Sequence, residues 1–240
     1  MNSPTIAVTG LHRGENPQPG SAVIRSLRRV YPELRIIGLC YDTLESGLYS
    51  EEDAPDAAFT LPYPSAGLEA FWDRLDAIRE IERFDVLIPC LDAEMAPLVE
   101  SPEKLRERGI SACLPSWKAF EARDKSKLPE LCERTHCRTP QTIPVNDVNS
   151  VHQAAATFGG SVFIKGRYYE AQLASTPAAR EAAYWHMLET WGAPVLVQER
   201  IEGEEFNVIG IGDGRGHILG SCAIRKMLRT ANGKGFGGMV

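Results

Sequence analysis

In the first half of the chain, short apolar runs of strand length alternate with segments in which apolar residues recur every three or four positions. Runs typical of buried strands occur at residues 6–10, 35–40, 58–61, 85–89 and 110–114. Segments with helical spacing occur at residues 21–30, 67–83 and 103–108, and the second should turn inward Leu68, Phe71, Leu75, Ile78 and Ile81. Strands alternating with helices are typical of β–α–β units, so this half is expected to form a doubly wound parallel sheet.

A second region begins after a boundary that we place near Pro115 and Ser116. Its expected helices lie at residues 117–122, 124–134, 148–158 and 177–191, and its expected strands at 141–145, 162–165 and 217–224. The glycine-rich segment 212–216 is typical of a hairpin turn. This region is therefore predicted to contain mixed and antiparallel strands.

The segment 195–208 is apolar at first, then acidic, then passes one glycine and becomes apolar again. One interpretation is a hairpin with a solvated turn, which this segment alone favours. The other is two strands with a kinked link, whose backbone N–H and C=O groups no neighbouring strand uses. Such groups can bind the edge of adenine, and a carboxylate just past the link, Glu205, can accept hydrogen bonds from ribose hydroxyls.

Two lysines upstream favour the second interpretation, because they could bind the phosphates of the same nucleotide. Lys165 ends an apolar strand, which places its ammonium group where phosphate oxygens could bind. Lys125 follows Asp124, the expected N-cap of a helix over residues 125–133. The alternative for Lys125 is a solvated lysine in the first turn, and the two interpretations are about equal.

Taken together, these features resemble the ATP-grasp superfamily, in the style of carbamoyl phosphate synthetase large-subunit-like proteins. That family orders an Asp-Lys pair at a helix start, a strand ending in lysine, and a hinge of the form Glu/Gln-Glu-x-Ile-x-Gly-x-Glu. The hinge is matched here by Gln198, Glu199, Ile201, Gly203 and Glu205. The resemblance extends from about Pro4 to the last residue. It implies a Rossmann-like domain over residues 1–115 and an incomplete α+β ATP-grasp module over residues 116–240.

The resemblance implies an ATP-dependent carboxylate–amine ligase that forms an acyl phosphate. It assigns the phosphates to Lys125 and Lys165, and the ribose to Glu205, with Glu204 as the alternative in register. Adenine would contact Gln198, Glu199 and Ile201, the latter two mainly through their backbone. Arg225 and Arg229 are candidates for binding an anionic carboxylate substrate, although a basic turn near the chain end explains both more simply.

Two departures from the family pattern affect the expected activity. The strand lysine is followed by Gly166-Arg167-Tyr168-Tyr169 rather than by a glycine-rich loop, so Arg167 would have to compensate through a bidentate phosphate contact. The family's Mg²⁺ ligands would lie beyond Arg229 and are not found in this chain. We therefore expect nucleotide binding without turnover, and an unpaired edge at residues 233–240 that another polypeptide or a second copy of the chain would complete.

Composition excludes several other classes of function. A net charge of −6 argues against broad nucleic-acid or membrane-surface binding. The six cysteines lack framework spacing, no leader or spanning run is evident, and we expect a reduced cytoplasmic protein. Two alternative functions remain, a catalytically incompetent nucleotide-binding module and an NAD-binding oxidoreductase. The latter rests on the first β–α–β unit and Asp42, but the loop lacks the compact Gly-x-Gly-x-x-Gly pattern.

Overall fold

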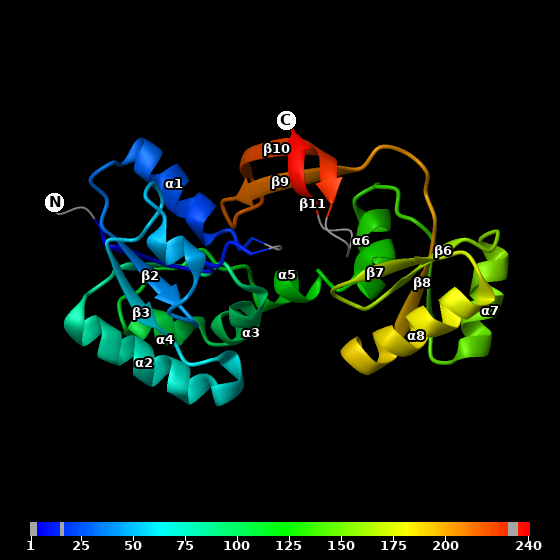
Figure 1. The fold of residues 1–240 in the computed structure, drawn as a ribbon, viewed down its shortest axis with the longest axis horizontal. Helices are drawn as coiled ribbons and strands as arrows, with labels where there is room; N and C mark the ends of the chain where they lie inside the picture. The colour runs from blue at the N-terminus through cyan, green and yellow to red at the C-terminus, as the bar shows by residue number, and fades with distance from the viewer. Residues whose placement is uncertain (1–3, 15–16, 230–234) are drawn as a thin grey trace. The chain divides into compact units, whose positions relative to one another are not determined.

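A computed structural model of the chain describes residues 4–14, 17–229 and 235–240, except for the side chains of Arg229 and Phe236. The chain divides into two compact units, residues Met1–Trp117 and Lys118–Val240 (Figure 1). Each unit has its own sheets and its own hydrophobic core. None of the helices among the described residues combines the length and apolar composition needed to cross a bilayer.

The first unit is built on a four-stranded parallel sheet. Its strands are β1 (Ile6–Thr9), β2 (Ile36–Cys40), β3 (Ala57–Thr60) and β4 (Val86–Ile88), in the order β3-β2-β1-β4. Ile6 on the central strand pairs with Ile36 on one side and Val86 on the other. This order and direction confirm the expected doubly wound sheet, with the switch in strand order between β1 and β4.

Helices cover both faces of this sheet (Figure 1). One core joins β1 and β2 to α1 (Gly20–Val30) through Ile24 and Val8. The opposite core contains Trp72, Leu75 and Ile78 of the helix α2 (Leu68–Ile81). The remaining short elements are the 3₁₀ turns η1 (Ser46–Tyr49) and η2 (Pro64–Ala66) and the helices α3 (Asp92–Glu100) and α4 (Pro102–Glu107).

Two expectations for the first unit are wrong. Residues 110–114 make only an isolated bridge, from Ser111 to Val86, because Ile110 packs into the core while the segment around it does not continue along β4. Ile81 is 71% exposed rather than inward. It is the last residue of α2, and Phe84, three residues later, fills that end of the core instead.

The second unit contains a four-stranded antiparallel sheet in the order β5-β8-β6-β7. Its strands are β5 (Thr142–Val145), β6 (Val162–Lys165), β7 (Ala171–Ala174) and β8 (Val195–Glu199). The helices α7 (Val148–Thr157) and α8 (Pro177–Trp191) pack on one face, where Val151 and Met187 meet the strands. The strand β7 was not among the strands predicted from the sequence.

Of the two helices predicted in the segment that leads into this sheet, the first is present, whereas the second, predicted over residues 124–134, is divided in two. The segment contains the helix α5 (Trp117–Glu121), the 3₁₀ turn η3 (Lys125–Lys127) and the helix α6 (Leu128–Arg134). Asp124 is the N-cap, as expected, and accepts a hydrogen bond from the Ser126 N–H. The α-helix starts only at Leu128 because Pro129 lacks an N–H and is tolerated in a first turn but not in a helix interior.

The strands on either side of the acidic segment belong to different sheets. β8 ends at Glu199, whereas β9 (Phe206–Gly212) pairs with β10 (Ile218–Arg229), which pairs in turn with β11 (Gly235–Met239). The hairpin interpretation of residues 195–208 is therefore wrong, and the kinked link is confirmed. Residues 235–239 pair with β10 and form an edge strand of this sheet, and residues 233 and 234 of the expected edge lie outside the described part.

Candidate nucleotide site

The face of the antiparallel sheet opposite α7 and α8 carries the candidate site. Successive side chains of a strand point to opposite faces, so Val162 and Ile164 contact the helices while Phe163 and Lys165 lie on the other side. In β8, Gln198 pairs in register with Phe163 and lies on that same side. One apolar and two polar side chains of neighbouring strands are thus brought together on the face that the helices leave uncovered.

A cleft of about 1140 Å³ opens over this face. Binding pockets for small ligands commonly measure roughly 300–1,000 Å³, so the cleft has room for a nucleotide. One wall is largely apolar and includes Pro140, Phe163, Leu173 and Phe206. The rest is formed by Lys165, Gln198 and the hinge, by which we mean residues 199–205. A flat apolar wall beside a polar hinge suits an aromatic base with hydrogen-bonding edges.

Gln198 holds Lys165 in place on this face. Its side-chain oxygen accepts a 2.5 Å hydrogen bond from Lys165 Nζ, and its Nε2 donates a 2.8 Å bond to Thr142 Oγ1. Burial, which Lys226 reinforces and Glu205 opposes, lowers the pKa of Lys165. Gln198, predicted to contact adenine, therefore contacts Lys165 directly in this structure, and its assignment to adenine stays a prediction.

Lys125 lies close enough to Lys165 for the two ammonium groups to repel each other. Burial first, and then this repulsion, lowers the pKa of Lys125 to about 8. Lysines normally titrate at about 10.4 and avoid one another unless an anion lies between them. The structure thus brings together the two lysines that the sequence assigned to the phosphates, although Lys125 is not part of the cleft lining itself.

Of the two backbone N–H groups of the hinge that were predicted to meet adenine, the Ile201 N–H is available to a ligand and the Glu199 N–H is not. The Glu199 N–H donates to the Gln141 carbonyl at 2.9 Å, and the Glu199 carboxylate accepts from the Gln141 N–H at 2.7 Å. In the described part of the chain, no hydrogen bond reaches the Ile201 N–H. Gly203 has φ +151, a backbone region that residues with a side chain rarely adopt, and this allows the chain to change sheets here.

Glu205 has a partner that sequence reasoning missed. Its Oε1 accepts a 2.5 Å hydrogen bond from Lys226 Nζ, and its backbone carbonyl accepts from the Lys226 N–H at 2.8 Å. The Lys226 side chain is only 13% exposed and also affects the pKa of Lys165. The strand predicted over residues 217–224 ended before Lys226, whereas β10 continues to Arg229 and so places the side chains of Arg225 and Lys226 on opposite faces.

Arg225 and Arg229 were proposed to bind an anionic substrate. Arg225 pairs with Glu204 and does not line the cleft. It sits in the middle of the three-stranded sheet, between Phe206 and Met239, so the interpretation of a basic turn near a frayed end is wrong for this residue. Arg229 ends β10, and its side chain lies outside the described part. A substrate role for either residue stays a prediction.

Arg167 is also engaged elsewhere. Its guanidinium forms an ion pair with the buried carboxylate of Asp124. The side chain therefore has a protein partner already, and this pairing weighs against the bidentate phosphate contact that its place after Lys165 suggested.

Two acidic side chains of the first unit also have hydrogen-bond partners within the protein. Asp42 accepts a hydrogen bond from the Leu44 N–H at 2.8 Å, within its own turn. Glu94 is buried and accepts hydrogen bonds from Thr9 Oγ1 at 2.6 Å and from the Tyr41 hydroxyl at 2.7 Å. Glu94 lies in the first turn of α3, whose N-terminus has no side-chain cap.

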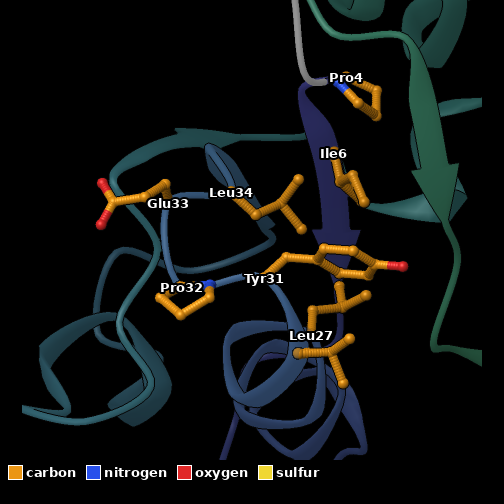
Figure 2. A pocket seen from close by; sticks show the side chains of 8 residues that line it. Pro4, Ile6, Leu27, Tyr31, Pro32, Glu33 and Leu34 are labelled. Atoms are coloured by element: carbon orange, nitrogen blue, oxygen red, sulfur yellow. The ribbon is translucent and has the colours of Figure 1, made fainter.

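A separate groove of about 520 Å³ lies where α1 ends and β1 begins (Figure 2). Figure 2 shows Ile6, Leu27 and Tyr31 along it, with the Glu33 carboxylate pointing away from them. Ligands of parallel α/β sheets bind at the carboxyl ends of the strands. This groove lies at the opposite end and lacks converging polar groups, so it is a poor candidate for a nucleotide.

Comparison with solved structures identifies the fold. The chain resembles biotin carboxylase from Campylobacter jejuni, solved in a complex with β-γ-ATP, with a TM-score of 0.65, 16% identity, and coverage of 95% of this chain and 52% of that one. It resembles L-amino acid ligase from Bacillus licheniformis with a TM-score of 0.64, 15% identity, and coverage of 99% and 54%. It also resembles N5-carboxyaminoimidazole synthetase from Staphylococcus aureus complexed with ADP. The TM-score is 0.63 and the identity 14%, and the match covers 94% of this chain and 55% of that one.

These three proteins are ATP-grasp enzymes, and the likeness shows that the chain has their fold. The chain spans about half the length of the solved structures it matches. No protein-family model and no curated protein sequence matches it.

Proposed function

We propose that this chain, which has the ATP-grasp fold, binds ATP in the cleft of residues 118–240 and serves an ATP-dependent carboxylate–amine ligase. The observation that carries the proposal is the 3.1 Å hydrogen bond from the Lys125 N–H to the Arg167 carbonyl, which joins the segments of Lys125 and Lys165 beside a cleft that Lys165 lines and that is large enough for a nucleotide. Two desolvated ammonium groups this close repel each other, and a polyphosphate is the ligand that relieves the repulsion.

The distribution of charge sets the orientation of the nucleotide. Acidic residues gather in the hinge, where Glu202 pairs with Arg200 and Glu205 with Lys226. The phosphates would be repelled there, so they extend towards the lysines, and the neutral base faces the hinge. Adenine then meets the Ile201 N–H and the apolar wall, and Glu205 accepts from the ribose hydroxyls. The two solved structures with an adenine nucleotide are consistent with this ligand class.

The chemistry that this arrangement serves is carboxylate activation. A carboxylate oxygen attacks the γ-phosphorus of ATP, ADP leaves, and an acyl phosphate forms. An amine then attacks the acyl carbon, the amide bond forms, and phosphate leaves. Lys125 and Lys165 would neutralise negative charge on the phosphates and hold them in line, which is most of what a protein contributes to phosphoryl transfer.

The family's Mg²⁺ ligands were expected beyond Arg229. Across residues 4–14, 17–229 and 235–240, no three His, Cys, Asp or Glu side chains gather in a way that would hold a metal ion. The hinge acids are instead paired with Arg200, Arg225 and Lys226.

Calorimetry on the purified chain with ATP, adenosine and NAD tests the proposal. ATP should bind more tightly than adenosine, because only ATP engages the lysines, and NAD should bind weakly. Lys165→Ala should lower ATP affinity about tenfold to a hundredfold, the range expected when a hydrogen bond to a charged group is lost, with adenosine affinity unchanged.

Lys127→Ala is the matched control, because Lys127 lies in the same segment as Lys125 but its side chain is half exposed and reaches only Glu121, at 3.9 Å. This variant should bind ATP as the unmodified chain does. Equal losses of ATP and adenosine affinity in Lys165→Ala would remove the phosphate role, and tight NAD binding without an ATP signal would favour the oxidoreductase alternative.

A further inference from the structure

Two segments of the second unit that lie far apart in sequence are joined residue by residue. We call residues 123–125 and 167–169, with the contacts between them, the clamp. Arg123 donates a hydrogen bond to the Tyr169 hydroxyl at 3.1 Å, and its guanidinium lies 4.9 Å from the Tyr168 ring centroid. The Lys125 N–H donates to the Arg167 carbonyl at 3.1 Å. Asp124 and Arg167 form an ion pair between these contacts.

The centre of the clamp is the carboxylate of Asp124, which is 1% exposed. Its Oδ1 accepts from the Ser126 N–H at 2.9 Å and from Ser126 Oγ at 2.8 Å, and its Oδ2 accepts from the Arg167 guanidinium. Burial alone would raise the pKa of Asp124, but the hydrogen bonds from Arg167 and Ser126 hold it below its ordinary value. The group is therefore an anion at neutral pH and binds Arg167 as an ion.

This arrangement determines where Lys125 lies. Lys125 directly follows Asp124, and Arg167 comes two residues after Lys165, so the clamp connects the two backbone segments that carry the phosphate lysines. The ammonium groups repel each other, as the lowered pKa of Lys125 indicates. Something must hold them together before a ligand arrives, and the clamp contacts are the ones that cross between the two segments.

An N-cap role alone does not account for Asp124. Asp147 caps α7 with the same pattern, accepting from the Ser150 N–H at 2.8 Å and from Ser150 Oγ at 2.6 Å. Asp147, however, is exposed to solvent, whereas Asp124 is buried against a guanidinium. The additional feature of Asp124 is thus its link to the loop after β6, the place where the sequence departs from a glycine-rich pattern.

We propose that the Asp124–Arg167 pair is a positioning device that holds Lys125 beside Lys165, so that the cleft is prepared for the polyphosphate of its ligand. The inference rests on the proposed nucleotide function and deepens it. Asp124 and Arg167 act through Lys125 rather than by touching the nucleotide. Loss of the pair should therefore weaken binding of the phosphates and leave binding of the base intact.

The experiment compares Asp124→Asn and Arg167→Gln with the matched control Asp147→Asn, using calorimetry with ATP and with adenosine on the full chain. Each clamp variant should lose about tenfold in ATP affinity, the effect of one displaced charged contact, with adenosine affinity unchanged. The double variant should lose little more than either single variant, because both remove the same link. Asp147→Asn should leave both affinities unchanged.

The pH dependence of ATP binding separates positioning from a direct charge effect. Removing a nearby carboxylate would by itself lower the pKa of Lys125. Releasing Lys125 from burial and from Lys165 would raise it, so ATP affinity in Asp124→Asn should decline at a higher pH than in the unmodified chain. If Asp124→Asn does not fold, Arg167→Gln carries the test, since it leaves the Ser126 bonds to Asp124 in place.

Three results would overturn the inference. They are unchanged ATP affinity in both clamp variants, equal loss of ATP and adenosine affinity, and a decline in affinity that moves to lower pH. In each case ATP binding by the unmodified chain would still support the proposed function. Absence of ATP binding by the unmodified chain would instead overturn the proposed function, and the inference with it.

Discussion

Lys125 is the residue whose charge state gives the site its pH dependence. Burial and the nearby Lys165 lower its pKa to about 8, because both disfavour the charged form. The lysine is therefore mostly charged at pH 7 and mostly neutral at pH 9. Phosphate binding requires the charged form, and a bound polyphosphate would in turn stabilise that form.

ATP affinity should consequently fall as the pH rises from about 7 to about 9, while adenosine affinity stays constant, and calorimetry across this range measures both. In Lys125→Arg the part of the fall centred near pH 8 should disappear, because a guanidinium stays charged throughout. A fall of the same size in Lys125→Arg would assign the titration to another group.

The role of an individual residue could be predicted from the sequence only where the neighbouring residues form a recognisable pattern. Asp124 was identifiable as a cap because a short polar acceptor precedes a helical segment, and the structure confirms this. The Asp124–Arg167 pair and the Lys226–Glu205 pair were not foreseen. Both join residues more than twenty positions apart, and such pairings depend on how the strands pack.

At the scale of elements, the hinge is the segment that we propose binds the base. Gly203 has φ +151, and an added Cβ would meet no atom within 4 Å, so the cost of a side chain there is backbone strain rather than collision. Such strain is of the order of 1–3 kcal/mol. The hinge would relax by changing its backbone path, and the Ile201 N–H would shift with it.

Gly203→Ala should therefore weaken ATP and adenosine binding by the same factor, because both ligands share the base, and calorimetry with the two ligands measures it. Gly214→Ala is the control, since Gly214 also has a positive φ, +73, but lies in the turn between β9 and β10 and does not line the cleft. Selective loss of ATP affinity in Gly203→Ala would place the phosphates, not the base, at the hinge.

Elements were predictable where their ends carry clear signals. Residues 162–165 and 177–191 were predicted with the bounds that the structure has, because Gly159-Gly160 and Lys165 delimit the strand and Pro177 starts the helix. Residues 110–114 were wrongly predicted as a strand, and β7 was not predicted, for the same physical reason. A short strand exists only if a neighbour pairs with it, and that depends on residues far away in sequence.

At the scale of the whole molecule, the two units offer different candidate positions for a nucleotide. The parallel sheet of the first unit has the strand order of dinucleotide-binding folds, but its candidate acid Asp42 is held in its own turn. The second unit has the paired lysines, the cleft and the hinge. The sequence already favoured the second unit for a nucleotide, because the two lysines and the hinge form local patterns, but it could not show that Asp42 would be held within its own turn.

A crystal structure of the chain with ADP tests this assignment most directly. We expect phosphate oxygens within about 2.7–3.2 Å of the Nζ atoms of Lys125 and Lys165, and a ring nitrogen of adenine at the Ile201 N–H. ADP bound instead at the carboxyl edge of the parallel sheet, near Gly10 and Asp42, would contradict the account.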